Sequence, residues 1–60
     1  MIMKLPTDPV ILLSVINTKL RDFYSTLDDL CEDMSIEKTE LENTLNSIDY
    51  QYDKKRNQFV

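Results

Sequence analysis

The sequence predicts one small, mainly α-helical domain of three helices, closed by a C-terminal β-hairpin. Two observations lead to this fold class. Apolar residues recur at spacings of three and four from residue 9 to residue 47, as expected of helices that each bury one face. From Asp49 onward, tyrosines alternate with polar residues, which is typical of a strand. The 60 residues form a single domain, and one of this size buries only about 60% of its unfolded surface, so we expect a thin margin of stability.

The first helix is predicted at about 9–24. Asp8 can cap its first amides, and Pro9 suits the first helical position because it lacks an N–H. The predicted inward stripe is Leu12, Ile16, Leu20 and Phe23, widened by Leu13 and Tyr24 on one side and by Ile11 and Val15 on the other. This arc is broader than one packing face requires. Either the helix is central and covered on both flanks, or Ile11 and Val15 contact a second copy of the chain.

A second helix is predicted at about 26–34 and a third at about 36–47. Ser25 or Thr26 can cap the second, and the acidic Asp28 and Asp29 in its first turn favour the positive end of the helix dipole. The expected inner faces are Leu27, Leu30, Cys31 and Met34 on the second helix, and Ile36, Leu41, Leu45 and Ile48 on the third. The break between the helices is short, so they must cross steeply.

The tail predicts a hairpin at about 49–60, in which 49–53 pairs with 57–60. The segment "DKKRN" has turn chemistry, with Asn57 able to adopt a left-handed conformation. Tyr50, Tyr52 and Phe59 are expected to close the core. An isolated hairpin is marginal, so this one needs the helices beneath it. An additional edge strand is expected at residues 2–5.

Two side chains in the helices have both a structural and a functional interpretation. Lys19 projects within the apolar arc, and we expect its stem to lie on apolar surface with its ammonium in water. The alternative is a buried ion pair or a partner contact. Cys31 is expected to be a small core residue rather than a reactive thiol.

Composition excludes the common catalytic and cofactor sites. Without glycine the chain lacks the usual phosphate-binding loops, and without histidine it lacks the usual general base. One cysteine forms no internal disulfide and, without histidine, no ordinary zinc or iron–sulfur site. The acidic set of Asp28, Asp29, Glu32 and Asp33 lies along a helix and lacks the spacing of a calcium loop. We therefore expect no enzyme, no cofactor and no metal.

The same composition predicts a cytoplasmic protein. A lone cysteine suits a reducing compartment, and no cleavable leader is evident. The apolar run "VILLSVI" has seven residues, whereas a membrane span takes about 20. We expect no membrane insertion.

The second and third predicted helices resemble a helix-turn-helix. Apolar or small residues occupy the places that this fold needs for its crossing helices, namely Leu30, Cys31, Met34, Ile36 and Leu41. The hairpin that follows is similar to the wing of a winged helix. Ser35 stands where glycine is usual, and Leu45 is displaced by one position. By the resemblance, Glu37, Lys38, Thr39, Glu42 and Asn43 would face a DNA groove.

The charge distribution disfavours DNA. The net charge is −4, and residues 25–47 hold seven carboxylates against Lys38 alone. DNA affinity rests mainly on neutralisation of phosphates by lysine and arginine, so this surface has the wrong sign. Lys54, Lys55 and Arg56 at the hairpin tip are the exception: they either contact phosphates or serve as solubilising charge on a turn.

The whole chain resembles a known group of proteins. "LPTDPVILLSVINTKLRDFYSTLDDLCEDM", followed by "YQYDKKRNQF", is similar to a family of short bacterial proteins catalogued as a domain of unknown function. The resemblance implies a free-standing bacterial protein and brings no activity, cofactor or binding residue.

These observations favour a non-catalytic protein–protein interaction module, with a homodimer as one form. A basic partner is expected to bind the exposed residues of the second and third helices, namely Asp28, Asp29, Glu32, Glu37, Glu42 and Asn43. Ile11 and Val15 are the candidate dimer contact. The alternative is a winged-helix-like transcriptional regulator that touches DNA through Lys54, Lys55 and Arg56.

Overall fold

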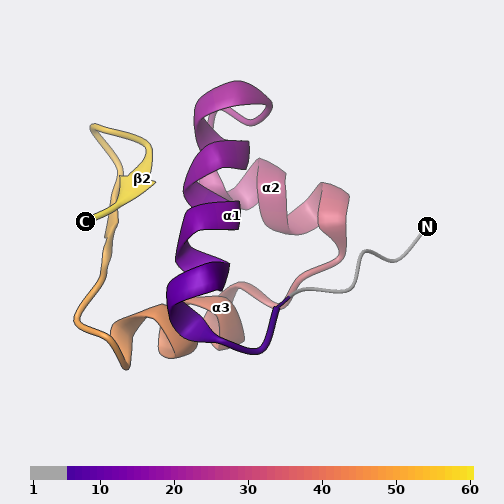
Figure 1. Ribbon diagram of the computed structural model, residues 1–60. Coiled ribbons are helices and arrows are strands. Elements are labelled where there is room, and N and C mark those ends of the chain that lie inside the picture. The colour runs from indigo at the N-terminus through magenta and orange to yellow at the C-terminus, as the bar shows by residue number, and fades with distance from the viewer. Residues whose placement is uncertain (1–5) are drawn as a thin grey trace.

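A computed structural model describes residues 6–60 and confirms the predicted fold class. This part of the chain forms three helices, α1 (Pro9–Asp22), α2 (Leu27–Met34) and α3 (Lys38–Asn46), and a hairpin of β1 (Tyr52–Asp53) and β2 (Gln58–Phe59). In Figure 1, α1 runs through the middle, with the hairpin on one side, α2 on the other and α3 across its N-terminal end. The edge strand predicted at residues 2–5 lies outside the described residues.

The start of α1 follows the prediction, but its end does not. The Asp8 carboxylate accepts a hydrogen bond from the Val10 amide at 2.9 Å, and Pro9 occupies the first turn. The helix ends at Asp22, so Phe23 leaves the helical path and is 72% exposed. The expectation that Phe23 lies on the inward stripe was therefore wrong. Tyr24 packs against the core instead.

Lys19 is half-buried near the end of α1. Its ammonium nitrogen lies 5.4 Å from the centre of the exposed Phe23 ring. The ring face attracts the cation, while the charge stays at the surface.

The tight turn between α2 and α3 forms without glycine. Thr26 caps α2 by accepting a hydrogen bond from the Asp29 amide at 3.1 Å. Ser35 ends the helix in the left-handed region, with φ 55°. The Ile36 amide then reaches back to the Cys31 carbonyl at 2.9 Å, which satisfies an end carbonyl of α2. Serine thus fills the position where the helix-turn-helix resemblance anticipates glycine, at some conformational cost.

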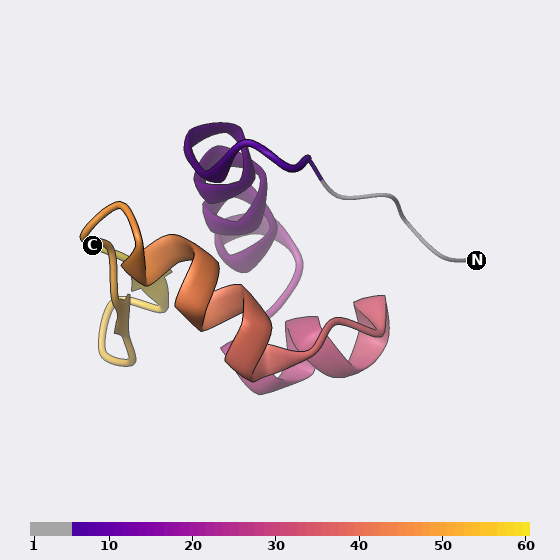
Figure 2. The same ribbon diagram turned by 90° about the horizontal axis from the view of Figure 1, so that it is seen from below.

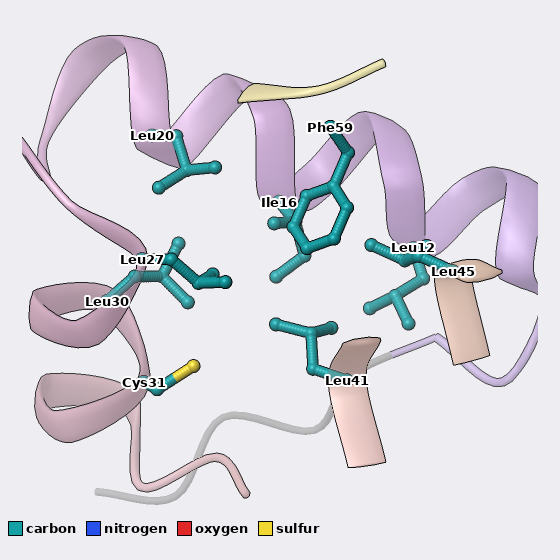
Figure 3. Close-up of a cluster of buried hydrophobic side chains, with 9 residues drawn as sticks. All are labelled: Leu12, Ile16, Leu20, Leu27, Leu30, Cys31, Leu41, Leu45 and Phe59. Carbon is teal, nitrogen blue, oxygen red and sulfur yellow. The ribbon is translucent and has the colours of Figure 1, made fainter. Parts of the chain in front are cut away.

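The core lies where α1, α2, α3 and β2 converge (Figure 3). Among the described residues, its buried members are Leu12, Ile16, Leu20, Leu27, Leu30, Cys31, Leu41, Leu45 and Phe59. Full burial of one large apolar side chain contributes about 1.5–3 kcal/mol, so each is a substantial part of a small domain's stability. Phe59 is only 2% exposed, although it lies next to the last residue of the chain.

The predicted hairpin is confirmed but is shorter than expected. Tyr52 pairs with Phe59 in antiparallel register, and Asn57 takes the predicted left-handed conformation with φ 53°. Tyr52 is half-buried and contacts the core, as expected. Tyr50 is 37% exposed, and its expected place in the core was wrong. Its amide still bonds to the Leu45 carbonyl, so Tyr50 belongs to the turn that follows α3 rather than to a strand.

Two asparagine side chains hold the hairpin against the helices. The Asn17 amide group donates to the Phe59 carbonyl at 3.1 Å and accepts from the Phe59 N–H at 2.8 Å. The Asn57 amide nitrogen donates to the carbonyl of Leu20, in the last turn of α1, at 3.1 Å, and to that of Tyr24, in the loop that follows, at 2.8 Å. The first bond satisfies an orphan carbonyl of α1.

The same network reaches the start of α2. The Tyr52 hydroxyl donates to the Asn57 side-chain oxygen at 2.6 Å and accepts from the Leu27 amide at 3.3 Å. The hairpin turn therefore caps both helix ends at the α1–α2 corner. The corner and the hairpin should stabilise one another.

We expect Asn57→Gly to lower the free energy of unfolding by about 2–3 kcal/mol, because it leaves two carbonyls and the Tyr52 hydroxyl without this partner. Asn57→Ala should cost about 1 kcal/mol more, because alanine resists the left-handed conformation. Urea unfolding followed by circular dichroism measures both changes.

The matched control is Asn46→Ala, at an exposed residue of α3, which should change the free energy by less than about 0.5 kcal/mol. An Asn57→Ala protein as stable as this control would contradict the capping role.

Candidate interaction surfaces

Over residues 9–18, one side of α1 is uncharged, and no other described element covers it. Between Asp8 and Lys19 the sequence has no charged residue. Val10, Ile11, Ser14 and Thr18 share one side of the helix by their spacing, and all four are exposed. We call these four residues the outer face of α1. Figure 2 shows α1 at the edge of the molecule, with α2, α3 and the hairpin on its other sides.

The predicted dimer contact lies partly on this face. Ile11 is 54% exposed within it, whereas Val15 is half-buried at its border. Val10 is 63% exposed on this face but was not among the predicted contact residues. The signal that would have found it is the ten-residue run without charge, rather than the inward stripe from which the prediction was made.

An open groove borders the outer face. It has a volume of about 480 Å³ and lies between α1 and the chain that enters and leaves the hairpin. Val10, Leu13 and Tyr50 form its apolar wall, and Asn17, Arg21 and Gln58 add polar groups. The outer face thus continues into apolar surface around Tyr50.

The acidic residues do not form one surface. Asp28 pairs with the Lys38 ammonium at 2.8 Å across the α2–α3 junction. The hydrogen bond from Lys38 and then its positive charge lower the pKa of Asp28, and the charge of Lys54 adds a smaller effect in the same direction. The pKa of Lys38 is raised by the same pair. Asp28 therefore stays ionised, and Lys38 partly balances its charge.

Asp29 and Asp33 of α2 face the other way, toward the α1–α2 loop. Asp29 accepts a hydrogen bond from the Ser25 hydroxyl at 3.4 Å. Asp33 accepts one from the Tyr24 hydroxyl at 2.5 Å, and this bond is the main reason that the pKa of Tyr24 is raised.

The remaining predicted partner-binding residues are distributed over α2 and α3. Glu32 is exposed on α2, Glu37 and Asn43 are exposed at the start and in the middle of α3, and Glu42 is half-buried. Negative charge therefore extends over both helices instead of concentrating at one point.

The basic hairpin tip adjoins the start of α2. Lys54 and Lys38 line the same cleft of about 410 Å³, together with Thr26, Asp28 and Tyr52. Lys54, Lys55 and Arg56 are all exposed, and the Arg56 guanidinium lies 3.7 Å from Asp53. The structure thus joins the predicted nucleic-acid contact to Lys38 of α3, but with the Asp28 carboxylate between them.

Cys31 is confirmed as a core residue, and its burial raises the pKa of its thiol. Within residues 6–60, no three side chains of the histidine, cysteine, aspartate or glutamate type are grouped so as to hold a metal ion. The helices of this part of the chain are all too short or too polar to cross a membrane.

One family matches the chain. It is described as Domain of unknown function (DUF4250), and the match covers residues 6–59. No curated protein and no solved structure matches the chain.

The Asp28–Lys38 pair predicts a specific pH dependence. A carboxyl whose pKa is lowered by folding stabilises the fold at pH values above its unfolded pKa of about 3.9, and this stabilisation disappears as pH falls through the lower folded pKa. We expect Asp28→Asn to be less stable than the wild type near neutral pH. The difference should shrink below about pH 4 and vanish in stronger acid.

Urea unfolding at a series of pH values measures this difference. Lys38→Met is the matched partner variant, and the Asp28→Asn change should have little effect in its background. A wild-type advantage over Asp28→Asn that stays constant from neutral pH into strong acid would contradict the pair.

Proposed function

The chain belongs to the DUF4250 family of domains of unknown function, and from this premise we propose that it is a non-catalytic protein–protein interaction module. The observation that carries this proposal is the outer face of α1, where Val10 and Ile11 are each more than half exposed on a surface without charge. Single exposed apolar residues are ordinary. A run of ten residues without charge on a helix is less ordinary, in a chain of which 30% is charged.

The chemistry of the face suits a protein partner. The centres of protein–protein interfaces are depleted in charged residues, as this face is. Burial of its apolar atoms would contribute about 25 cal/mol for each Å² removed from water. The apolar wall of the adjacent groove, at Leu13 and Tyr50, would extend the contact.

The side chains present give little support for catalysis. The sequence has no histidine, and the Cys31 thiol is buried, with a raised pKa that keeps it protonated. The module is proposed to act in the cytoplasm, where a lone thiol stays reduced.

Two partners follow from the distribution of charge. The outer face of α1 would contact a second copy of the chain. The exposed carboxylates Asp29, Glu32 and Glu37 would attract a basic protein surface, with Asn43 as a neutral hydrogen-bonding group nearby in the sequence. Asp28 and Glu42 would contribute less, because Asp28 is paired with Lys38 and Glu42 is half-buried.

We expect sedimentation equilibrium to give a mass near twice that of the monomer at tens of micromolar protein. Ile11→Lys should shift the chain to monomer, because it places a charge in the uncharged face. Circular dichroism should show the variant folded, since Ile11 is exposed.

Phe23→Lys is the control for this measurement. It also replaces an exposed apolar residue with lysine, but beyond the end of α1 and off the outer face. If the wild type stays monomeric, or if both variants behave alike, self-association through this face is wrong.

A second candidate function is polyanion contact of the winged-helix kind. The observation that favours it is the shared cleft of Lys38 and Lys54, which sets the hairpin tip beside the first residue of α3. Lys55 and Arg56 add exposed positive charge at the tip. The opposing factors are Asp28 within the cleft and the other carboxylates of α2.

A fluorescence anisotropy titration with mixed-sequence duplex DNA at low salt separates the two functions. For an interaction module we expect no binding at tens of micromolar protein. Binding that weakens steeply with salt, and that is lost when Lys54, Lys55 and Arg56 are changed to alanine, would instead establish the second function.

A further inference from the structure

The charges at the two ends of α1 specify how the outer face would be covered. We infer that α1 pairs antiparallel with the α1 of a second copy, with Ser14 at the two-fold axis. This inference rests on the proposed function. The interface would consist of Val10, Ser14 and Thr18 from each chain, bordered by Ile11. Salt bridges between Asp8 of one copy and Arg21 of the other would close both ends.

The order of charges along α1 favours this pairing. Asp8 is exposed at the N-terminal end, and Arg21 is exposed near the C-terminal end, on the same side of the helix as Ser14. They are separated by about 20 Å along the axis, and no charged residue of the outer face lies between them. The N-terminal end is therefore negative, and the C-terminal end, with Lys19 and Arg21 against Asp22, has a net positive charge. The middle is uncharged.

Only the antiparallel orientation brings opposite charges together. In an antiparallel pair centred on Ser14, Val10 lies opposite Thr18, and Asp8 lies opposite the turn that holds Arg21. Opposite charges then meet at both ends. A parallel pair would place Asp8 against Asp8 and Arg21 against Arg21, and it would also align the two helix dipoles unfavourably.

The sizes of the side chains on the outer face also fit this pairing. Ser14, at the proposed axis, is the smallest residue of the outer face, which permits the helix axes to approach to about 8 Å. The larger Val10 then packs against the methyl group of Thr18. A two-fold contact of this kind uses the same patch on both subunits, so the patch must be complementary to itself.

Two copies of the chain would meet with the least repulsion at the outer face. The chain has a net charge of −4, so most contacts between two copies would bring carboxylates together. The outer face avoids this repulsion because it has no charge. Arg21 already donates two hydrogen bonds to Asp22, at 2.9 Å and 3.0 Å. This pair joins two exposed neighbours, so Asp8 of a second copy would have to compete with it or share the guanidinium.

Cysteine cross-linking tests the geometry directly. In a Cys31→Ala background, Ser14→Cys should form an intermolecular disulfide under mild oxidation at least about tenfold faster than Thr18→Cys, because a disulfide needs Cα atoms within about 7 Å. In the antiparallel pair the two residues at position 18 are offset by about 12 Å along the axis. An equimolar mixture of Val10→Cys and Thr18→Cys should yield the mixed dimer.

Two outcomes overturn the inference. Equal, fast cross-linking through positions 14 and 18 would show a parallel pair. Cross-linking at position 14 no faster than for Thr39→Cys, on α3, while the wild type still sediments as a dimer, would show a different interface and leave the proposed function standing. A wild type that stays monomeric would remove this inference and the self-association part of the proposed function, but not the proposed contact with a basic partner.

Charge reversal provides a second test that does not depend on the cysteine variants. Arg21→Glu should weaken the dimer several-fold in sedimentation, because it places two carboxylates together at each end. Arg56→Glu, at the hairpin tip, makes the same change in net charge and should leave the dimer nearly intact. Equal effects of the two reversals would overturn the proposed Asp8–Arg21 contact.

Discussion

The hydrogen bonds between the Asn17 side chain and the backbone of Phe59 are the contact on which the remaining architecture depends. Phe59 is the largest fully buried side chain, yet it lies on a two-residue strand at the end of the chain. A two-stranded hairpin alone is marginal in water. The Asn17 amide bonds both the N–H and the carbonyl of Phe59, as a third strand would, so the outer edge of β2 is satisfied while the ring is held in the core. The Asn57 and Tyr52 groups then fix the other end of the hairpin to the α1–α2 corner.

This arrangement determines what remains exposed. The hairpin covers one flank of α1, and α2 and α3 pack against the side that carries Leu12, Ile16 and Leu20 (Figure 3). A helix enclosed in this way has one free side, and on α1 that side has no charge between Asp8 and Lys19. A domain of this size has little apolar surface to spare for contacts outside its core. The exposure of Val10 and Ile11 is the feature from which we propose a partner.

The parts of the structure that follow local rules were predictable from the sequence. The caps at Asp8 and Thr26, the left-handed Asn57 and the inner faces of the helices depend on near neighbours, and they were confirmed. The end of α1 was missed by two residues, which was enough to turn Phe23 outward. The bonds of Asn17 and Asn57 were not predicted, because each joins residues more than 30 positions apart. Asp28 was predicted to be available to a partner, whereas packing of α2 against α3 places it beside Lys38.

The pairing of Asp28 also changes what the net charge of −4 implies. At the α2–α3 junction, Lys38 and Lys54 locally balance the acids, so repulsion of a polyanion is weaker there than the average charge suggests. Away from this junction, the exposed Asp29 and Glu32 keep the surface of α2 negative. Pairing through the uncharged side of α1 would leave these acids outside the contact in each copy. A dimer would then present these acidic residues twice, and a basic partner with two matching patches would gain affinity from both contacts at once.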